Sequence, residues 1–305
     1  MNIDYNLLAQ RIIYSRYAQI VINEYIRNKK FKIPIHLAMG HESIAESLSL
    51  SMNESDLLVC SHRNIHYHLA MGAKFQEIFN EFMLAPSGLS SGNEGSMNLT
   101  CRKNKIFYTS NILGNNLSVS LGLALSKKIN DEDGIVFVVT GDGAIEEGSF
   151  YEAIENARNM DLPIIFLVEN NQWSLASHIS ERRKPISLSN FAFSLGADYV
   201  LLEDNDPIRY FELIRSIRET ALVNDSPAII EVNLTTFGFW NMENENYPDG
   251  KYVNYHAGLA PNISVEKSLL FASDSSDPLT IILDKIGEKN FEHLLAEVKG
   301  LIFAP

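Results

Sequence analysis

Short apolar runs alternate with longer helical stretches through the middle of the chain. The runs are continuous and rich in β-branched residues, as expected of strands buried on both faces, and they lie at 135–139, 164–168, 199–202 and 228–232. The stretches between them repeat apolar positions at helical spacing, over 117–128, 150–158 and 207–223. This alternation predicts an α/β fold, a doubly wound, mostly parallel sheet with helices on both faces.

The two ends of the chain have different patterns. Helical spacing covers the first thirty residues and then 42–52 and 74–84, with one short buried strand at 57–60. Residues 237–262 are Asn-rich and aromatic without periodicity, which indicates a long loop, and one helix is expected near 279–298. We therefore predict one domain over 1–245, including an N-terminal helical segment, with 246–305 forming a loop and a C-terminal helix that pack on it.

Composition narrows the class of protein. The 305 residues are 46% hydrophobic and 21% charged, which is ordinary for a soluble globular chain. Acidic residues outnumber basic ones by 38 to 25, so binding to nucleic-acid phosphates is not expected. Two distant cysteines, Cys60 and Cys101, are too few for a disulfide framework or a zinc site. No leader of the signal type and no apolar run near the roughly 18 residues of a membrane span is present, so we expect a cytoplasmic protein without a membrane partner.

The first candidate for chemistry is a carboxylate between two glycines at the end of a predicted strand. Gly141, Asp142 and Gly143 directly follow the apolar run 135–139. Glycines let backbone N–H groups approach a phosphate closely, and the carboxylate can hold a cation that the phosphates share. Magnesium favours this arrangement. Taken alone, an Asp-Gly pair is also a common turn.

The second candidate lies at the end of the next predicted strand. Asn170 and Asn171 follow the run 164–168, and Asn171 lies 171 − 142 = 29 residues after Asp142. One strand–helix–strand unit takes about thirty residues. Because the carboxyl ends of parallel strands share one sheet edge, Asp142 and Asn171 are expected within reach of one ion.

These residues stand in a longer pattern that resembles a known family. Gly141-Asp142-Gly143 followed at this spacing by Asn170-Asn171 resembles the thiamine diphosphate motif. The flanking sequence is similar to the alpha subunit of the decarboxylating component of 2-oxo acid dehydrogenase complexes, a group that includes acetoin dehydrogenase alpha subunits. The similarity extends over about residues 30–236 and rests on the segments 36–43, 61–63, 92–98, 112–116, 141–153 and 161–171.

The resemblance implies a thiamin diphosphate-binding fold and a role for nine residues. For Mg²⁺, it implies the Asp142 carboxylate, the Asn171 side chain and the Trp173 backbone carbonyl as ligands. For thiamine diphosphate, it implies contacts from the glycine motif, from an Arg–His pair that suits the diphosphate, and from a leucine that supports the bent cofactor. The cofactor-binding residues are His62, Arg63, Leu113, Gly141, Gly143, Ala144 and Asn171.

The same resemblance implies a partner chain. In this family a beta-type subunit carries the aminopyrimidine-binding domain and supplies the Glu that activates the cofactor, usually in an α₂β₂ heterotetramer. The chain alone is then expected to be inactive. The implied small-molecule substrate is a 2-oxo acid, with pyruvate the first expectation.

The sequence departs from the family in the loop after its last strand. That loop reads Tyr-Arg-x-His-Gly-His-Ser in the family, whereas residues 235–241 here contain neither His nor Arg, and Ile65 replaces another family His. His256 is a candidate catalytic substitute, or else an exposed loop histidine. Trp240 either lines an acceptor pocket or anchors the loop.

The departures leave several functions open. The rebuilt loop favours transfer of the two-carbon unit to a carbonyl or sugar-nucleotide acceptor, which is carboligation. The alternatives are an ordinary lipoamide-linked pyruvate or acetoin dehydrogenase alpha subunit, a transketolase-like half subunit, and a non-catalytic binding subunit.

Overall fold

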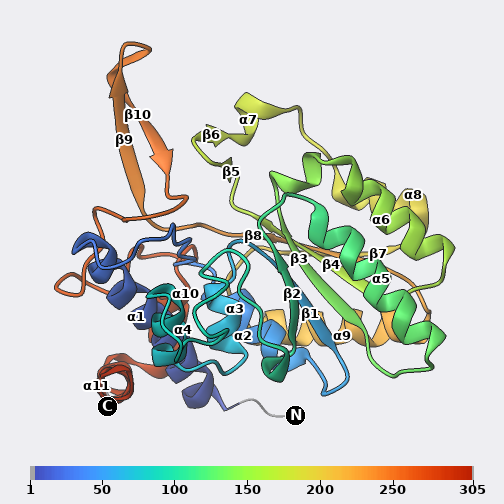
Figure 1. Cartoon of the computed structure of the whole chain (residues 1–305), viewed down its shortest axis with the longest axis horizontal. Helices are drawn as coiled ribbons and strands as arrows, with labels where there is room; N and C mark the ends of the chain where they lie inside the picture. Colours follow the sequence, from blue (N-terminus) through green and yellow to red (C-terminus); the bar gives the residue numbers. More distant parts are fainter. Residues whose placement is uncertain (1–3, 304–305) are drawn as a thin grey trace.

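The centre of the protein is a six-stranded parallel sheet. A computed structural model describes residues 4–303 (Figure 1). The strands lie in the order β2-β1-β3-β4-β8-β7, and every neighbouring pair is parallel. Their bounds are β1 Leu57–Ser61, β2 Ile106–Ser110, β3 Val136–Gly141, β4 Ile164–Asn170, β7 Asp198–Leu202 and β8 Ala228–Asn233. The predicted fold class is confirmed, and β2, an edge strand that the sequence pattern did not predict, completes the sheet.

Helices cover both faces because the strand side chains are buried on both sides. One face packs against α5 (Asn115–Ile129), α6 (Gly148–Asn159) and α8 (Leu188–Leu195), and the other against α2 (Glu42–Ser51), α3 (Ile65–Ala70) and α9 (Pro207–Val223). Along β3, Val136 and Val138 join the first core while Phe137 and Val139 join the second. The continuous apolar run is thus the sequence signature of a doubly covered strand.

A third core lies beside the sheet and joins the two ends of the chain. The helices α1 (Tyr5–Arg27) and α4 (Phe75–Phe82) share it with α10 (Pro278–Ile286) and α11 (Glu288–Ile302). A fully buried Arg16 pairs there with Glu42 at 2.6 Å and with Asp277 at 2.9 Å. Division of the chain at residue 245 stays a prediction.

Two expectations for the C-terminal part are wrong. Residues 237–262 contain an antiparallel hairpin, β9 (Phe239–Asn244) with β10 (Tyr247–Asn254), which projects from the body of the protein (Figure 1). It buries few side chains on either face, so no apolar alternation marks it. The single helix expected near 279–298 is two helices, because Gly287 takes a positive φ of 78° between them.

A helix that crosses a bilayer needs about 20 mostly apolar residues. No helix between residues 4 and 303 is both long enough and apolar enough to do so.

Candidate functional site

One cavity at the carboxyl edge of the sheet collects all ten residues that the sequence analysis assigned to the site. It lies where β1, β3 and β4 end, and the strand order reverses between β1 and β3. A reversal of this kind leaves a crevice outside the strand ends. Lining residues are His62, Arg63, Leu113, Gly141, Asp142, Gly143, Ala144, Asn171, Trp173 and His256, joined by His41, Ser61, Glu169 and Ser174.

Asp142 is buried directly after β3 and carries a positive partner. Its backbone N–H donates to the Glu169 carbonyl at 3.1 Å, which fixes the turn. Its Oδ2 accepts from Arg182 Nη2 at 2.5 Å, and Arg182, the last residue of α7 (Ile179–Arg182), also pairs with Glu146. Burial raises the pKa of Asp142 to about 6, although Arg182 acts in the opposite direction. The carboxylate therefore sits where a cation is needed, and a guanidinium occupies one of its oxygens.

Close backbone packing explains the glycine after Asp142. A Cβ atom on Gly143 would lie 2.7 Å from the Ser174 hydroxyl oxygen. Ser174 belongs to β5 (Trp173–Ser174), which pairs with β6 (Ser177–His178) in a short hairpin before α7. A side chain at 143 would push this hairpin away from the cavity.

Of the two adjacent asparagines, only Asn171 lines the cavity. Its Oδ1 accepts from the Trp173 backbone N–H at 3.0 Å, and its Nδ2 donates to Thr236 Oγ1 at 2.7 Å. The Asn170 side chain instead donates to Glu231 on β8 at 2.9 Å. The two amides thus serve different neighbours, as the alternating direction of strand side chains requires.

Glu169 is the centre of a buried polar group that we call the Glu169 cluster: His41, His66, Tyr67 and Glu169. Its Oε1 accepts from Tyr67 Oη at 2.8 Å and bonds to His66 Nε2 at 2.9 Å, and its Oε2 lies 3.3 Å from His41 Nδ1. Burial alone would raise the pKa of Glu169, but the two histidines beside it hold that pKa below its ordinary range. Glu169 is therefore an ionised carboxylate with its own donors.

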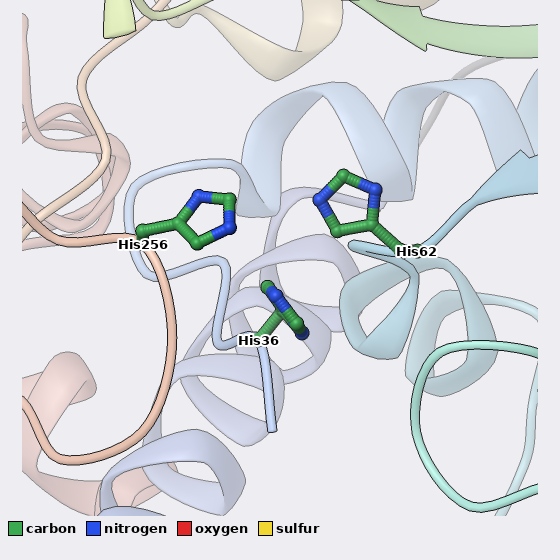
Figure 2. Close-up of side chains that lie close together, drawn as sticks. All are labelled: His36, His62 and His256. Carbon is green, nitrogen blue, oxygen red and sulfur yellow. The ribbon is translucent and has the colours of Figure 1, made fainter. Parts of the chain in front are cut away.

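A second histidine group lies at the other side of the cavity, and we call it the open cluster: His36, His62 and His256. The ring centroids of His36 and His62 are 4.8 Å apart, and those of His36 and His256 are 4.9 Å apart; the three side chains face one another (Figure 2). None of the three rings makes a hydrogen bond to any residue in 4–303, and His36 Nδ1 is buried without a partner. The reading of His256 as an exposed loop histidine is wrong, because its ring packs against the other two.

Electrostatics keep the open cluster neutral. Burial, reinforced by the positive charge of Arg63, lowers the pKa of His36 to about 2, of His62 to about 4 and of His256 to about 3. The imidazoles therefore present free lone pairs and N–H groups to a ligand at neutral pH.

Arg63 is buried, and no acidic residue in the described chain pairs with it. Its Nη1 donates to the Leu37 carbonyl, and its Nη2 donates to the His256 carbonyl at 3.1 Å. Only 8% of the residue is exposed, and burial lowers its pKa. A buried guanidinium without a carboxylate is costly unless an anion binds beside it.

Leu113 brings an apolar surface to the same cavity. It is 47% exposed and precedes Gly114, which starts α5 with a φ of 76°. A Cβ at Gly114 would meet the Ser149 hydroxyl at 2.3 Å, so glycine lets this loop lie against the beginning of α6. An exposed leucine held in place in this way is suited to contact a ligand.

The sequence pattern did not reveal several polar residues that line the cavity or lie behind its wall. His41, His66, Glu169, Thr236 and Arg182 received no role, although they contact or neighbour the assigned ligands. Glu169 carried a usable signal, an ionisable residue at the last positions of a fully apolar strand. The others carried none, because their partners lie far away in the sequence.

The sequence of the chain is similar to a known protein family. The model of the dehydrogenase E1 component family matches residues 9–244. The pyruvate dehydrogenase E1 component subunit alpha of Rickettsia conorii is 26% identical over 236 residues, which cover 77% of this chain and 72% of that protein. The subunit of the same name from Rickettsia bellii is 28% identical, covering 65% of this chain and 60% of that protein.

Among solved structures, transketolases share the fold. A transketolase from Pichia stipitis superposes with a TM-score of 0.61 at 14% identity, covering 96% of this chain and 46% of that chain. A transketolase from Leishmania mexicana gives a TM-score of 0.56 at 16% identity, covering 98% and 48%. This chain spans about half the length of those enzymes. With the family match over more than three quarters of the sequence, the chain belongs to the dehydrogenase E1 component family.

Proposed function

We propose that this chain is the alpha-type subunit of a two-subunit enzyme that uses thiamine diphosphate and Mg²⁺ to decarboxylate a 2-oxo acid, with pyruvate the first candidate. The observation that carries the proposal is a separation of charge within one cavity. Asp142 is a buried carboxylate suited to a metal ion, and Arg63 is a buried guanidinium suited to an anion. A metal diphosphate satisfies both.

The residues present fit these two groups. Asp142, the Asn171 side chain and the Trp173 carbonyl would supply oxygen ligands, which Mg²⁺ prefers. Arg63 and His62 would hold diphosphate oxygens, and Gly143 and Ala144 would donate from the backbone. When bound, thiamine diphosphate supplies the electron sink that loss of CO₂ requires.

A beta-type partner follows from what the cavity lacks. Activation of the cofactor needs a free acid, and Glu169 already accepts hydrogen bonds from His66 and Tyr67. We therefore assign the activating Glu to a partner subunit, in an α₂β₂ assembly. Relatives named subunit alpha support this assignment.

For the fate of the two-carbon unit we favour a carbonyl or sugar-nucleotide acceptor. The β9–β10 hairpin follows β8 where the resembled family has its histidine-containing loop, and its exposed aromatic residues Phe239 and Tyr252 stack at 5.4 Å. His256 is the catalytic candidate on this side of the cavity. The second candidate, lipoamide-linked oxidation, is favoured by family membership.

Cofactor binding is tested with thermal melts of the chain and its partner, with and without Mg²⁺ and thiamine diphosphate. Ligand at 100 times its Kd adds about 2.7 kcal/mol of stability. Asp142→Ala should abolish the shift, whereas Asp198→Ala, an exposed residue that begins β7, should retain it. An Asp142→Ala shift equal to the wild-type shift would overturn the metal assignment.

The acceptor is tested by supplying the pair with pyruvate and either a lipoyl domain or a carbonyl acceptor. CO₂ release coupled to carboligation is expected. Efficient acylation of the lipoyl domain with no use of carbonyl acceptors would select the second candidate.

A further inference from the structure

We propose that Thr236 and His41 are positioning residues that fix the Asn171 amide so that its oxygen, and not its nitrogen, faces a bound cation. This inference rests on the proposed function. It concerns an unbroken line of polar contacts from Asn171 Nδ2 through Thr236 and His41 to Glu169.

The direction of hydrogen-bond donation along these contacts follows from which atoms carry a proton. An amide nitrogen only donates, so Thr236 Oγ1 accepts from Asn171 at 2.7 Å. The single Thr236 proton is then directed to His41 Nε2, also at 2.7 Å. The His41 proton is then on Nδ1, which lies 3.3 Å from Glu169 Oε2, an electrostatic contact without the geometry of a hydrogen bond. Asn171 thus donates to Thr236 and Thr236 to His41, and the remaining His41 proton is on the side of the carboxylate.

The far end of the line is held in place. Glu169 Oε1 is already engaged by His66 and Tyr67, so the carboxylate cannot turn away. His41 and Thr236 are each 1% exposed, so water does not substitute for either partner. A buried chain of contacts whose far end is held in this way favours one arrangement of the groups along it.

The backbone is built to bring these segments together. Thr236 follows β8, and its neighbours are clamped on both sides, by Leu234 N–H to the Asn170 carbonyl at 3.2 Å and Phe237 N–H to the Met39 carbonyl at 2.8 Å. Gly40 has a φ of 102°, and a Cβ there would lie 2.0 Å from the Thr235 carbonyl. Only glycine allows His41 to reach Thr236.

The consequence concerns the choice between two amide orientations. With its nitrogen bound to Thr236, Asn171 directs Oδ1 away, where it accepts from Trp173 and keeps a second lone pair for a metal. A flipped amide would place its oxygen against the lone pairs of Thr236. The hydroxyl therefore disfavours the orientation that presents N–H groups to the ion.

The test measures metal affinity, with Mn²⁺ as the probe. Binding of Mn²⁺ to the chain with its partner, in the presence of thiamine diphosphate, is followed by electron paramagnetic resonance. Thr236→Val keeps the shape but removes the hydroxyl, and should weaken Mn²⁺ binding by about tenfold or more, the usual size for a residue behind a metal ligand. Thr236→Ser restores the hydroxyl and should bind within about twofold of wild type.

A double-variant cycle tests the connection to His41. His41→Leu should weaken Mn²⁺ binding, and adding Thr236→Val should cause little further loss, because both changes break the same line. Thr236→Val binding Mn²⁺ as tightly as wild type, or fold-losses that simply multiply, would overturn the inference while the proposed function stands. If wild type binds no Mn²⁺, both fail.

Discussion

The Glu169 cluster and the open cluster border one cavity and use the same side chain in opposite ways. In the first, His41 and His66 surround a carboxylate and a tyrosine. In the second, three imidazoles face one another beside Arg63, and no ring among them bonds to the described protein (Figure 2). In the Glu169 cluster each histidine has a hydrogen-bonded Nε2 and so supports the structure, whereas a ring with no hydrogen-bond partner at either nitrogen is ready for a ligand.

The two clusters are expected to contribute to different free energies, one to folding and the other to ligand binding. Donors gathered on Glu169 stabilise the fold whether or not a ligand is present. The open cluster leaves polar atoms unsatisfied until something binds, so its contribution is expected in affinity. Substitutions in the two clusters should therefore differ in which measurement they change.

The largest effect is expected from Glu169→Gln. The amide cannot accept from Tyr67 and His66 with the strength of a carboxylate, and a buried network is left incomplete, so unfolding free energy should fall by about 3 kcal/mol. Urea denaturation measures this. Glu231→Gln is the matched control, a half-buried carboxylate within β8 that accepts from Asn170 and Tyr199. A smaller loss for Glu169→Gln than for its control would break the comparison.

The next effect concerns pH. The pKa of His36 is about 2 in the folded chain and near 6.5 when unfolded, so the unfolded state takes up the proton first. Its stabilising contribution is complete above pH 6.5 and is lost as pH falls toward the folded pKa. Between pH 7 and 5 the wild type should lose about 2 kcal/mol through this group.

His36→Asn removes that titration and should flatten the pH profile of unfolding free energy by this amount. His293→Asn is the control, because His293 is exposed on α11, with 69% of its side chain accessible. Profiles of equal slope for His36→Asn and wild type would contradict the neutral, buried state of the open cluster.

A smaller effect is expected at Asp142, where the Arg182 guanidinium already pairs with the carboxylate. Arg182→Met frees Asp142 from its guanidinium partner, so Mg²⁺ no longer competes for that oxygen and its affinity should rise about fivefold, or about 1 kcal/mol. Isothermal titration with the partner and thiamine diphosphate present measures it. Arg183→Met should change affinity less, because Arg183 pairs with Glu146 at 3.1 Å and acts on Asp142 only through its charge, without a hydrogen bond. Unchanged affinity in Arg182→Met would show that Mg²⁺ binds without displacing the guanidinium.

The smallest change in stability is expected from His62→Asn. Its ring makes no hydrogen bond that folding depends on, so unfolding free energy should move by less than about 1 kcal/mol. Affinity for thiamine diphosphate should fall instead, because His62 lines the cavity beside Arg63. A large loss of stability with unchanged affinity would reverse the roles of the two clusters.

Much of the fold and the candidate site could be predicted, because both depend on local pattern. The apolar run before Gly141 marks a doubly covered strand, and strand ends in a parallel sheet must meet, which brings Asp142 and Asn171 to one edge. Thr236 and His41 could not be predicted, since 195 positions separate them and their contact depends on tertiary packing. The β9–β10 hairpin could not be predicted either, because its exposed side chains follow no periodicity.

The buried Arg16 has a consequence for how the protein can be divided. Its guanidinium holds Glu42, beside His41, and also Asp277, at the start of α10. A fragment that stops at residue 245 would keep the Arg16–Glu42 pair but lose the Asp277 carboxylate and the Leu269 carbonyl, which accept from the same guanidinium, so its remaining N–H groups would have no protein partner. The last sixty residues thus stabilise the wall of the cavity. Their removal should unfold the protein, and loss of ligand binding would follow from that.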